Sequence, residues 1–129
     1  MSESTTVLII ASPGRLRDGL RVLLRASAAI AQIAQADDLL SGLQQIAQFP
    51  PDLVLLDADL PDGQIWEAVR QIRQQWPECG CVVLAHTTHQ ERMAWAGGAT
   101  AVLPDGFSTE ALFNVITRYK GVNRNENLS

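Results

Sequence analysis

The sequence predicts a doubly wound α/β fold: one five-stranded parallel sheet in the order 2-1-3-4-5, covered by helices on both faces to give three layers. Short apolar runs alternate along the chain with longer segments whose apolar residues recur at helical spacing. The run Leu53-Val54-Leu55-Leu56 has no polar face, which is typical of a parallel strand covered on both sides. The length of 129 residues, without a repeat or a linker, is that of one domain.

Composition narrows the class of protein further. The chain is 47% hydrophobic with a formal net charge of −4, which argues against a dedicated nucleic-acid or membrane surface. No apolar run approaches the roughly 18 residues of a membrane span, and the N-terminus shows no signal peptide. We therefore expect a cytoplasmic protein. Cys79 and Cys81 are expected to be reduced, packing thiols rather than metal ligands.

The first half of the chain yields three strands and two helices. A strand is predicted at 6–11, after which Ser12 and Pro13 are expected to cap and begin a helix that runs to about residue 27. A weak strand follows at 29–36. Asp37 or Asp38 is expected to cap the second helix, which Phe49-Pro50-Pro51 ends before the strand at 53–57. The residues expected to face inward from this second helix are Leu39, Leu43, Ile46 and Ala47.

The second half repeats the alternation. A third helix after Gly63 carries apolar residues at helical spacing and ends before Pro77. The remaining elements are predicted as a strand at 81–85, a short helix at 90–97, a brief strand at 100–103 and a last helix capped by Ser108. The folded domain is expected to span 1–121, and the unpatterned tail 122–129 is expected to be disordered.

Asp57 ends the central strand and is the candidate functional residue. In parallel α/β sheets ligands bind at the carboxyl edge, where the first and third strands of this order lie side by side. The ends of the other strands therefore join Asp57 there. They are Ala11 and Ser12, then Ala85 and His86, then Pro104 and Asp105.

Several segments of the sequence support a family resemblance, and they are specific only when taken together. They lie at 17–24 (Arg-x-Gly-Leu-x-x-Leu-Leu), 51–63 (Pro-Asp-Leu-Val-Leu-Leu-Asp-x-x-Leu-Pro-Asp-Gly), 70–73, 82–84 and 98–99. Over nearly its whole length the chain resembles the receiver domain of two-component response regulators, most closely those that precede a helix-turn-helix output domain. The resemblance implies a flavodoxin-like fold and a role in phosphorelay signal transduction.

The resemblance also implies a site of five parts, of which this chain keeps one. Asp57 matches the aspartate that accepts a phosphoryl group. Receivers hold Mg²⁺ with two acidic residues after the first strand, and they carry a Thr or Ser, an aromatic residue and a Lys near the ends of the fourth and fifth strands. The corresponding positions here are Ala11 and Ser12 for the acidic pair, Ala85 for the hydroxyl, Val102 for the aromatic residue and Asp105 for the lysine.

These departures predict a receiver fold whose ordinary switch is absent. Asp105 would bring a second carboxylate toward Asp57, so one of the two should resist ionisation, and Mg²⁺ should not bind. We expect a non-enzymatic module that acts by protein contact, with a histidine kinase or an output protein as partner and a homodimer as a further option. The resemblance points to the face formed by the fourth helix, fifth strand and fifth helix. Exposure of Trp95 would favour a partner surface there.

Other interpretations stay open. Asp57 could be phosphorylated with unusual chemistry, or Asp57, Asp59 and Asp105 could form a rearranged cation site. Asp57-Ala58-Asp59 also fits the D-x-D of haloacid-dehalogenase-type phosphatases, although that family places the motif on its first strand. His86 and His89 could bind a metal, but with no third ligand near them in sequence they are expected to line a solvated loop.

Overall fold

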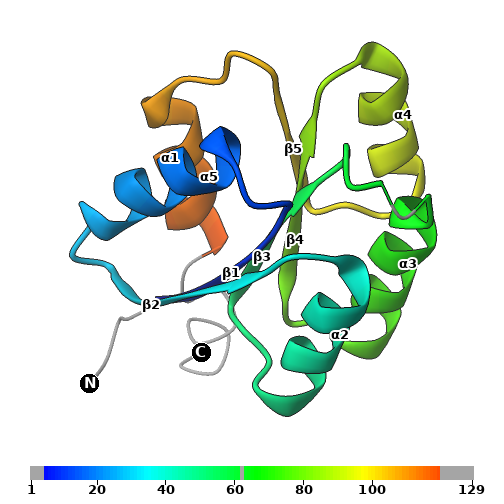
Figure 1. The fold of residues 1–129 in the computed structure, drawn as a ribbon, viewed down its shortest axis with the longest axis horizontal. Helices are drawn as coiled ribbons and strands as arrows, with labels where there is room; N and C mark the ends of the chain where they lie inside the picture. The colour runs from blue at the N-terminus through cyan, green and yellow to red at the C-terminus, as the bar shows by residue number, and fades with distance from the viewer. Residues whose placement is uncertain (1–4, 62, 120–129) are drawn as a thin grey trace.

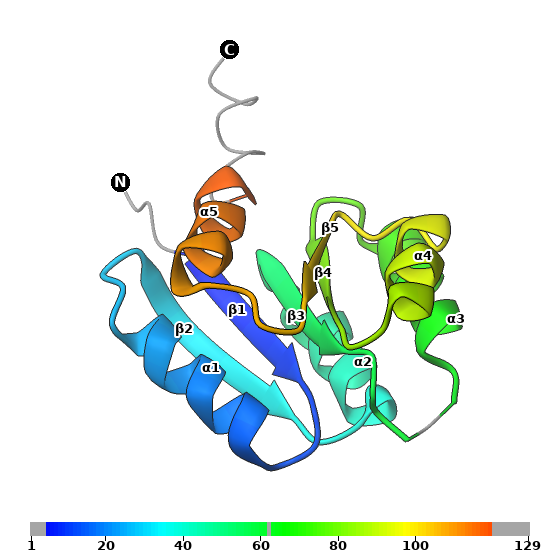
Figure 2. The same cartoon turned by 90° about the horizontal axis from the view of Figure 1, so that it is seen from above.

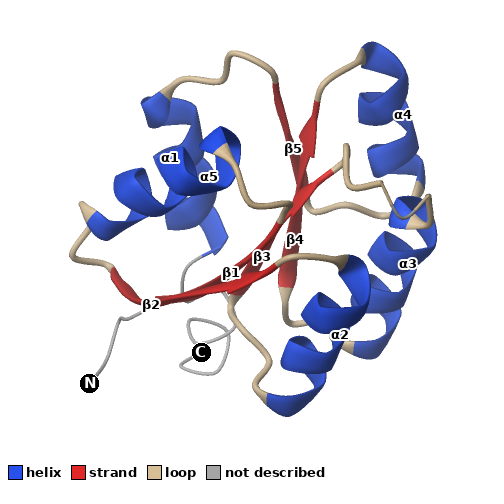
Figure 3. Ribbon diagram, in the orientation of Figure 1, coloured by secondary structure: helices blue, strands red, loops and turns tan. Residues whose placement is uncertain are grey.

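The computed structural model describes residues 5–61 and 63–119 and has the predicted architecture (Figures 1 and 3). Its five-stranded sheet is parallel in the order β2-β1-β3-β4-β5. The strands are β1 (Thr5–Ile10), β2 (Ile30–Ala36), β3 (Leu53–Asp57), β4 (Gly80–Ala85) and β5 (Ala101–Pro104). The helices are α1 (Arg15–Arg25), α2 (Leu39–Gln48), α3 (Ile65–Gln75), α4 (Thr88–Ala96) and α5 (Thr109–Tyr119).

The sheet separates two apolar cores. Helices α1 and α5 lie on one side of it, and α2, α3 and α4 on the other (Figure 2). Because side chains alternate along a strand, Val7 and Ile9 of β1 pack into the first core, whereas Leu8 and Ile10 pack into the second. Central strand β3 feeds both cores, and the side chains from Leu53 to Leu56 are at most 1% exposed. This burial explains the uninterrupted apolar run that ends at Asp57.

The capping predictions are confirmed for α2 and α5 and wrong for α1. The Asp38 carboxylate accepts the Ser41 N–H at 2.8 Å, and the Ser108 hydroxyl accepts the Ala111 N–H at 2.9 Å. Helix α1 begins later than predicted, with Gly14 at the N-cap position and no side-chain cap. Ser12 is exposed and lies too far before the first turn to reach its N–H groups.

Helix α2 faces the sheet with most of the predicted residues, and Ala47 is the exception. Leu39 and Ile46 are buried as predicted, and Leu43 is half-buried against the core. Gly42 is also buried, while Ala47 is exposed. The reason is the close approach at Gly42, where an added Cβ would lie 2.5 Å from Cδ1 of Ile10. That contact centres the inner face on Gly42 and turns Ala47 outward, a consequence of packing that spacing alone does not show.

Two further points concern the tail and the length of the helices. The expectations for the tail at 122–129 lie outside the described residues. Within the part of the chain that the structure describes, none of the helices has the length and apolar character needed to cross a membrane.

Candidate functional site

Asp57 stands where the predicted topology places it, at the carboxyl edge of the sheet. It is the last residue of β3 and lies in register with Leu84 of β4, while its neighbour Leu56 pairs with Ile10 of β1. The ends of β1, β4 and β5 therefore surround the Asp57 side chain, which is 13% exposed. A nearly covered carboxylate in this position needs partners for its charge.

The principal partner of Asp57 is His86, the residue that follows β4. Its Nε2 lies 2.7 Å from Oδ1 of Asp57, and its Nδ1 lies 2.6 Å from Oδ1 of Asp105, which follows β5. Nε2 is also 3.7 Å from Oδ2 of Asp59. The imidazole thus lies between the carboxylates that end β3 and β5.

This geometry implies a charged imidazole. Ionised carboxylates only accept hydrogen bonds, so both ring nitrogens of His86 must donate for both contacts to form. Burial lowers the pKa of His86, but the hydrogen bonds to Asp57 and Asp105, with the charges of Asp57 and Asp59, outweigh burial and raise it above its ordinary value. The site therefore carries its own cation.

Gln90, at the start of α4, ties the loops of the site together. Its Oε1 accepts the backbone N–H of His86 at 2.7 Å, and its Nε2 donates to Oδ1 of Asp59 at 2.9 Å. The Asp59 N–H in turn donates to Oδ1 of Asp57 at 2.9 Å. The loops after β3 and β4 are thus held to each other by side chains.

Two expectations about these residues are wrong. Asp105 does not oppose Asp57 as an unscreened carboxylate, because the His86 ring lies between them. Nor does His86 line a solvated loop, since its side chain is only 21% exposed and the fold brings Asp57 and Asp59 to it, whereas His89 is exposed as expected. The usable signal in the sequence was the place of His86 directly after a buried strand, next to the strand of Asp57.

The end of β1 offers no carboxylate for a metal. Ala11 is fully buried and Ser12 exposed. The Arg17 guanidinium donates to the carbonyl oxygen of Ala11 at 3.2 Å and pairs with Asp37 at 2.5 Å. A cation thus lies against the backbone at the end of β1, next to the positions where the resemblance implies an acidic pair. These residues do not fit the Mg²⁺ that receivers hold there, since Mg²⁺ prefers several oxygen ligands in octahedral geometry.

The remaining degenerate positions carry no polar chemistry. Ala85 ends β4 with only a buried methyl group, 1% exposed, next to Pro104 of β5. Val102 is half-buried and packs against the core on the α2, α3 and α4 side. There is therefore no hydroxyl at the end of β4 and no aromatic ring at this position in β5.

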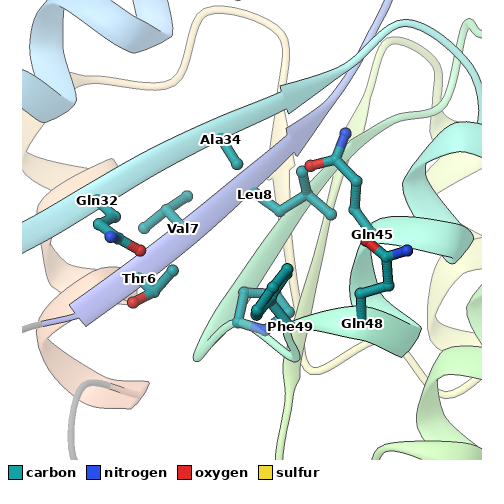
Figure 4. Close-up of a pocket in the computed structure, with 9 residues that line it drawn as sticks. Thr6, Val7, Leu8, Gln32, Ala34, Gln45, Gln48 and Phe49 are labelled. Atoms are coloured by element: carbon teal, nitrogen blue, oxygen red, sulfur yellow. The ribbon is translucent and has the colours of Figure 1, made fainter.

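Features away from Asp57 do not compete with it as a site. Burial raises the pKa values of the Cys79 and Cys81 thiols to about 12, so both stay protonated and serve packing, as expected. A groove of about 300 Å³ between α2 and strands β1 and β2 is lined by apolar side chains, glutamines and Thr6, with Phe49 at its rim (Figure 4). It lacks charged lining residues, so no ionic chemistry is built into it.

Comparisons with known proteins agree with the fold. The family model of the response regulator receiver domain matches residues 7–117. The KDP operon transcriptional regulatory protein KdpE of Escherichia coli is 36% identical over 81 residues, which are 63% of this chain and 35% of that protein. The nitrate/nitrite response regulator protein NarL of Escherichia coli is 27% identical over 94 residues, 73% of this chain and 44% of that protein. The chain thus matches less than half the length of these relatives.

Solved structures show the same fold at low identity. The signal receiver domain of an HD domain-containing protein from Pseudomonas fluorescens gives a TM-score of 0.86 at 20% identity, covering 98% of this chain and 94% of that one. The chemotaxis response regulator CheY4 of Vibrio cholerae gives 0.78 at 22% identity, covering 90% and 98% respectively.

Proposed function

This chain belongs to the response regulator receiver domain family of two-component signalling, and we propose that it is an atypical member in which His86 holds Asp57. Receiver domains are in general signalling modules rather than enzymes, and they bind Mg²⁺ at an acidic pocket. We propose that this chain is likewise no enzyme, that it works by protein contact in the cytoplasm, and that its Asp57 is not switched by Mg²⁺-dependent phosphorylation.

The observation that carries the proposal is the occupation of Asp57 Oδ1. This oxygen accepts from His86 at 2.7 Å and from the Asp59 N–H at 2.9 Å, so its lone pairs are engaged. Phosphorylation would require the oxygen that attacks to be free and aligned with the phosphoryl donor. Attack through Oδ1 would therefore require that oxygen to leave a charge-assisted contact first.

The charges around Asp57 also oppose phosphoryl transfer. The developing negative charge needs a metal ion and a cation aimed at the phosphoryl oxygens. The acidic pair for the metal is replaced by Ala11 and Ser12, and the lysine position holds Asp105, whose charge has the opposite sign. A phosphoryl group would add about −1.5 to −2 beside that carboxylate.

A phosphoryl group that did form would lack the usual means to change the structure. Ala85 has no hydroxyl to move toward it, and Val102 has no ring to rotate. A switch requires a two-state element that the modification biases. We therefore propose that signalling by this chain depends on which partner it contacts.

The test is phosphorylation by acetyl phosphate with Mg²⁺, followed by intact mass. We expect no stable adduct, with Asp57→Asn as the blank and a phosphorylatable receiver in the same tube as the positive control. A variant with Ser12→Asp, Ala85→Thr, His86→Ala and Asp105→Lys restores much of the family pattern and should gain reactivity. An adduct on the unaltered chain that Asp57→Asn abolishes would overturn the proposal and favour a phosphorelay receiver.

We propose the face made by α4, β5 and α5 as the contact surface for a histidine kinase or an output protein, or for a second copy. Its support is Trp95 on α4, which is 55% exposed and offers a partner a large aromatic surface. Trp95→Ala should weaken binding to proteins that co-purify with the chain from its own cells. Leu40→Ala on α2, exposed to 67%, is the matched control and should not. Equal losses from both variants would argue against this face.

A further inference from the structure

We propose that Asp57, Asp59 and His86 form a binding site for a divalent transition-metal ion, with Zn²⁺ as the representative. The inference concerns the site of the proposed function and names a ligand that could regulate it. It rests on that proposal only in assuming that His86, and not a phosphoryl group, is the resident partner of Asp57.

The three side chains point their ligand atoms at one another. Nε2 of His86 and one carboxylate oxygen each from Asp57 and Asp59 all lie within 4.8 Å of each other. In a tetrahedral Zn²⁺ site with bonds of about 2.0–2.2 Å, ligand atoms stand about 3.4 Å apart. The distances from Nε2 to Asp57 Oδ1 and Asp59 Oδ2 are 2.7 and 3.7 Å, which bracket that value. Small side-chain shifts would therefore admit an ion in place of the Nε2 proton, which would leave to solvent.

Residues outside this trio hold two of the ligands in orientation. Asp105 binds Nδ1 of His86 at 2.6 Å, which leaves Nε2 to face the two aspartates. A carboxylate on the far nitrogen of a ligating histidine is one of the usual arrangements in protein metal sites. Gln90 holds Oδ1 of Asp59 at 2.9 Å and leaves its Oδ2 toward His86. Neutralising the charge of Asp57 requires only His86, and does not require the contacts made by Asp105 and Gln90.

The donor set selects a class of metal. An imidazole nitrogen with two carboxylate oxygens suits Zn²⁺ and its first-row neighbours, whereas Mg²⁺ prefers oxygen ligands throughout. Three protein ligands leave a fourth tetrahedral position for water or for a donor from a partner protein. The ion would thus be a regulatory cation at the carboxyl edge of the sheet, where Ala11 and Ser12 replace the acidic pair.

Local charge also favours a cation. Asp57, Asp59 and Asp105 all converge on the single imidazole, and within 5–61 and 63–119 their ion pairs are with His86 alone. One imidazolium balances one of three carboxylates. Replacing its Nε2 proton by a divalent ion leaves one uncompensated charge instead of two.

Zn²⁺ titration of the metal-free chain tests the inference, with affinity measured by calorimetry and ligation by histidine ring ¹⁵N shifts. The sequence has two histidines, so His89, exposed on α4, is the matched control. We expect His86→Gln to abolish Zn²⁺ binding, Asp59→Asn to weaken it at least tenfold, and Asp105→Asn to weaken it about 10- to 100-fold. His89→Gln should leave it unchanged, and Mg²⁺ should bind at least 100-fold more weakly than Zn²⁺.

The outcomes separate this inference from the proposed function. Zn²⁺ affinity that survives His86→Gln, or Mg²⁺ binding as tight as Zn²⁺ binding, would overturn the metal site. The phosphorylation assay decides the proposed function independently, since it scores an adduct on Asp57 and not metal affinity. Circular dichroism of each variant shows whether loss of Zn²⁺ binding reflects loss of the fold. A folded His86→Gln variant that still binds Zn²⁺ in the calorimeter would refute the inference directly.

Discussion

The contact between His86 and Asp57 makes a quantitative prediction about stability and pH. His86→Gln removes the imidazolium charge and leaves an amide whose two N–H donors are on one nitrogen, so it cannot replace both ring nitrogens. The hydrogen bond lost at the covered Asp57 is charge-assisted and contributes about 1.5–3 kcal/mol at most. The contact to Asp105, which is 66% exposed, is screened by solvent and adds less than about 1 kcal/mol. Since the amide recovers part of this, we expect a net loss of about 1–2 kcal/mol at pH 6 without metal.

The pH dependence follows from the raised pKa of His86. A group whose folded pKa lies above its unfolded value of about 6.5 contributes its full charge-dependent stability below that value. The contribution is lost as pH rises through the folded pKa, because the neutral ring can donate from only one nitrogen. The stability difference between the unaltered chain and His86→Gln should therefore be largest near pH 6 and shrink toward pH 9.

Urea unfolding from pH 5.5 to 9 in the presence of EDTA measures this difference directly. A loss of about 1–2 kcal/mol corresponds to a fall in Tm of about 3–10 °C for a domain of this size. His89→Gln is the control, and its difference from the unaltered chain should stay near zero throughout. A His86→Gln difference that is constant across this range, or that grows with pH, would refute the account of a charged His86 between carboxylates.

Two other predictions concern single substitutions. Asp105→Asn should lower the pKa of His86 in an NMR titration and destabilise the chain by up to about 1 kcal/mol near pH 6; stabilisation would instead restore the idea of direct repulsion between Asp57 and Asp105. Gly42→Ala should destabilise by about 1–3 kcal/mol, because its Cβ would meet Ile10 at 2.5 Å, whereas Gly19→Ala in α1 meets nothing within 4 Å and should stabilise by about 0.5–1 kcal/mol. Thermal unfolding of the two glycine variants checks this, and equal effects would contradict the close approach of α2 to β1.

The fold was predictable because its signals are local. The apolar run before Asp57, the caps at Asp38 and Ser108 and the alternation of strands and helices each depend on a few adjacent residues. Parallel strands with helical crossovers then allow few arrangements, so the order 2-1-3-4-5 and the place of Asp57 followed.

Packing between elements was less predictable. Gly42 lets α2 approach β1 and thereby turns Ala47 to solvent, although the spacing of apolar residues had placed Ala47 inward. Similarly, Ser12 and Pro13 carry the local signature of a helix start, but the chain stays non-helical until Arg15. In both cases the local sequence preference is weak, and tertiary packing against the sheet overrides it.

The sequence alone determined that Asp57 stands at the carboxyl edge of the sheet and that Ala11, Ser12, Ala85 and Asp105 depart from the receiver pattern. Only the tertiary structure decided which group neutralises the carboxylate of Asp57. His86 is 29 residues from Asp57 and 19 from Asp105, so their meeting depends on which strands are neighbours and on the direction of one side chain. The sequence suggests that the carboxylates of Asp57 and Asp105 repel each other. In the fold the His86 ring lies between them and hydrogen-bonds to both, and electrostatic energy depends on such distances in space.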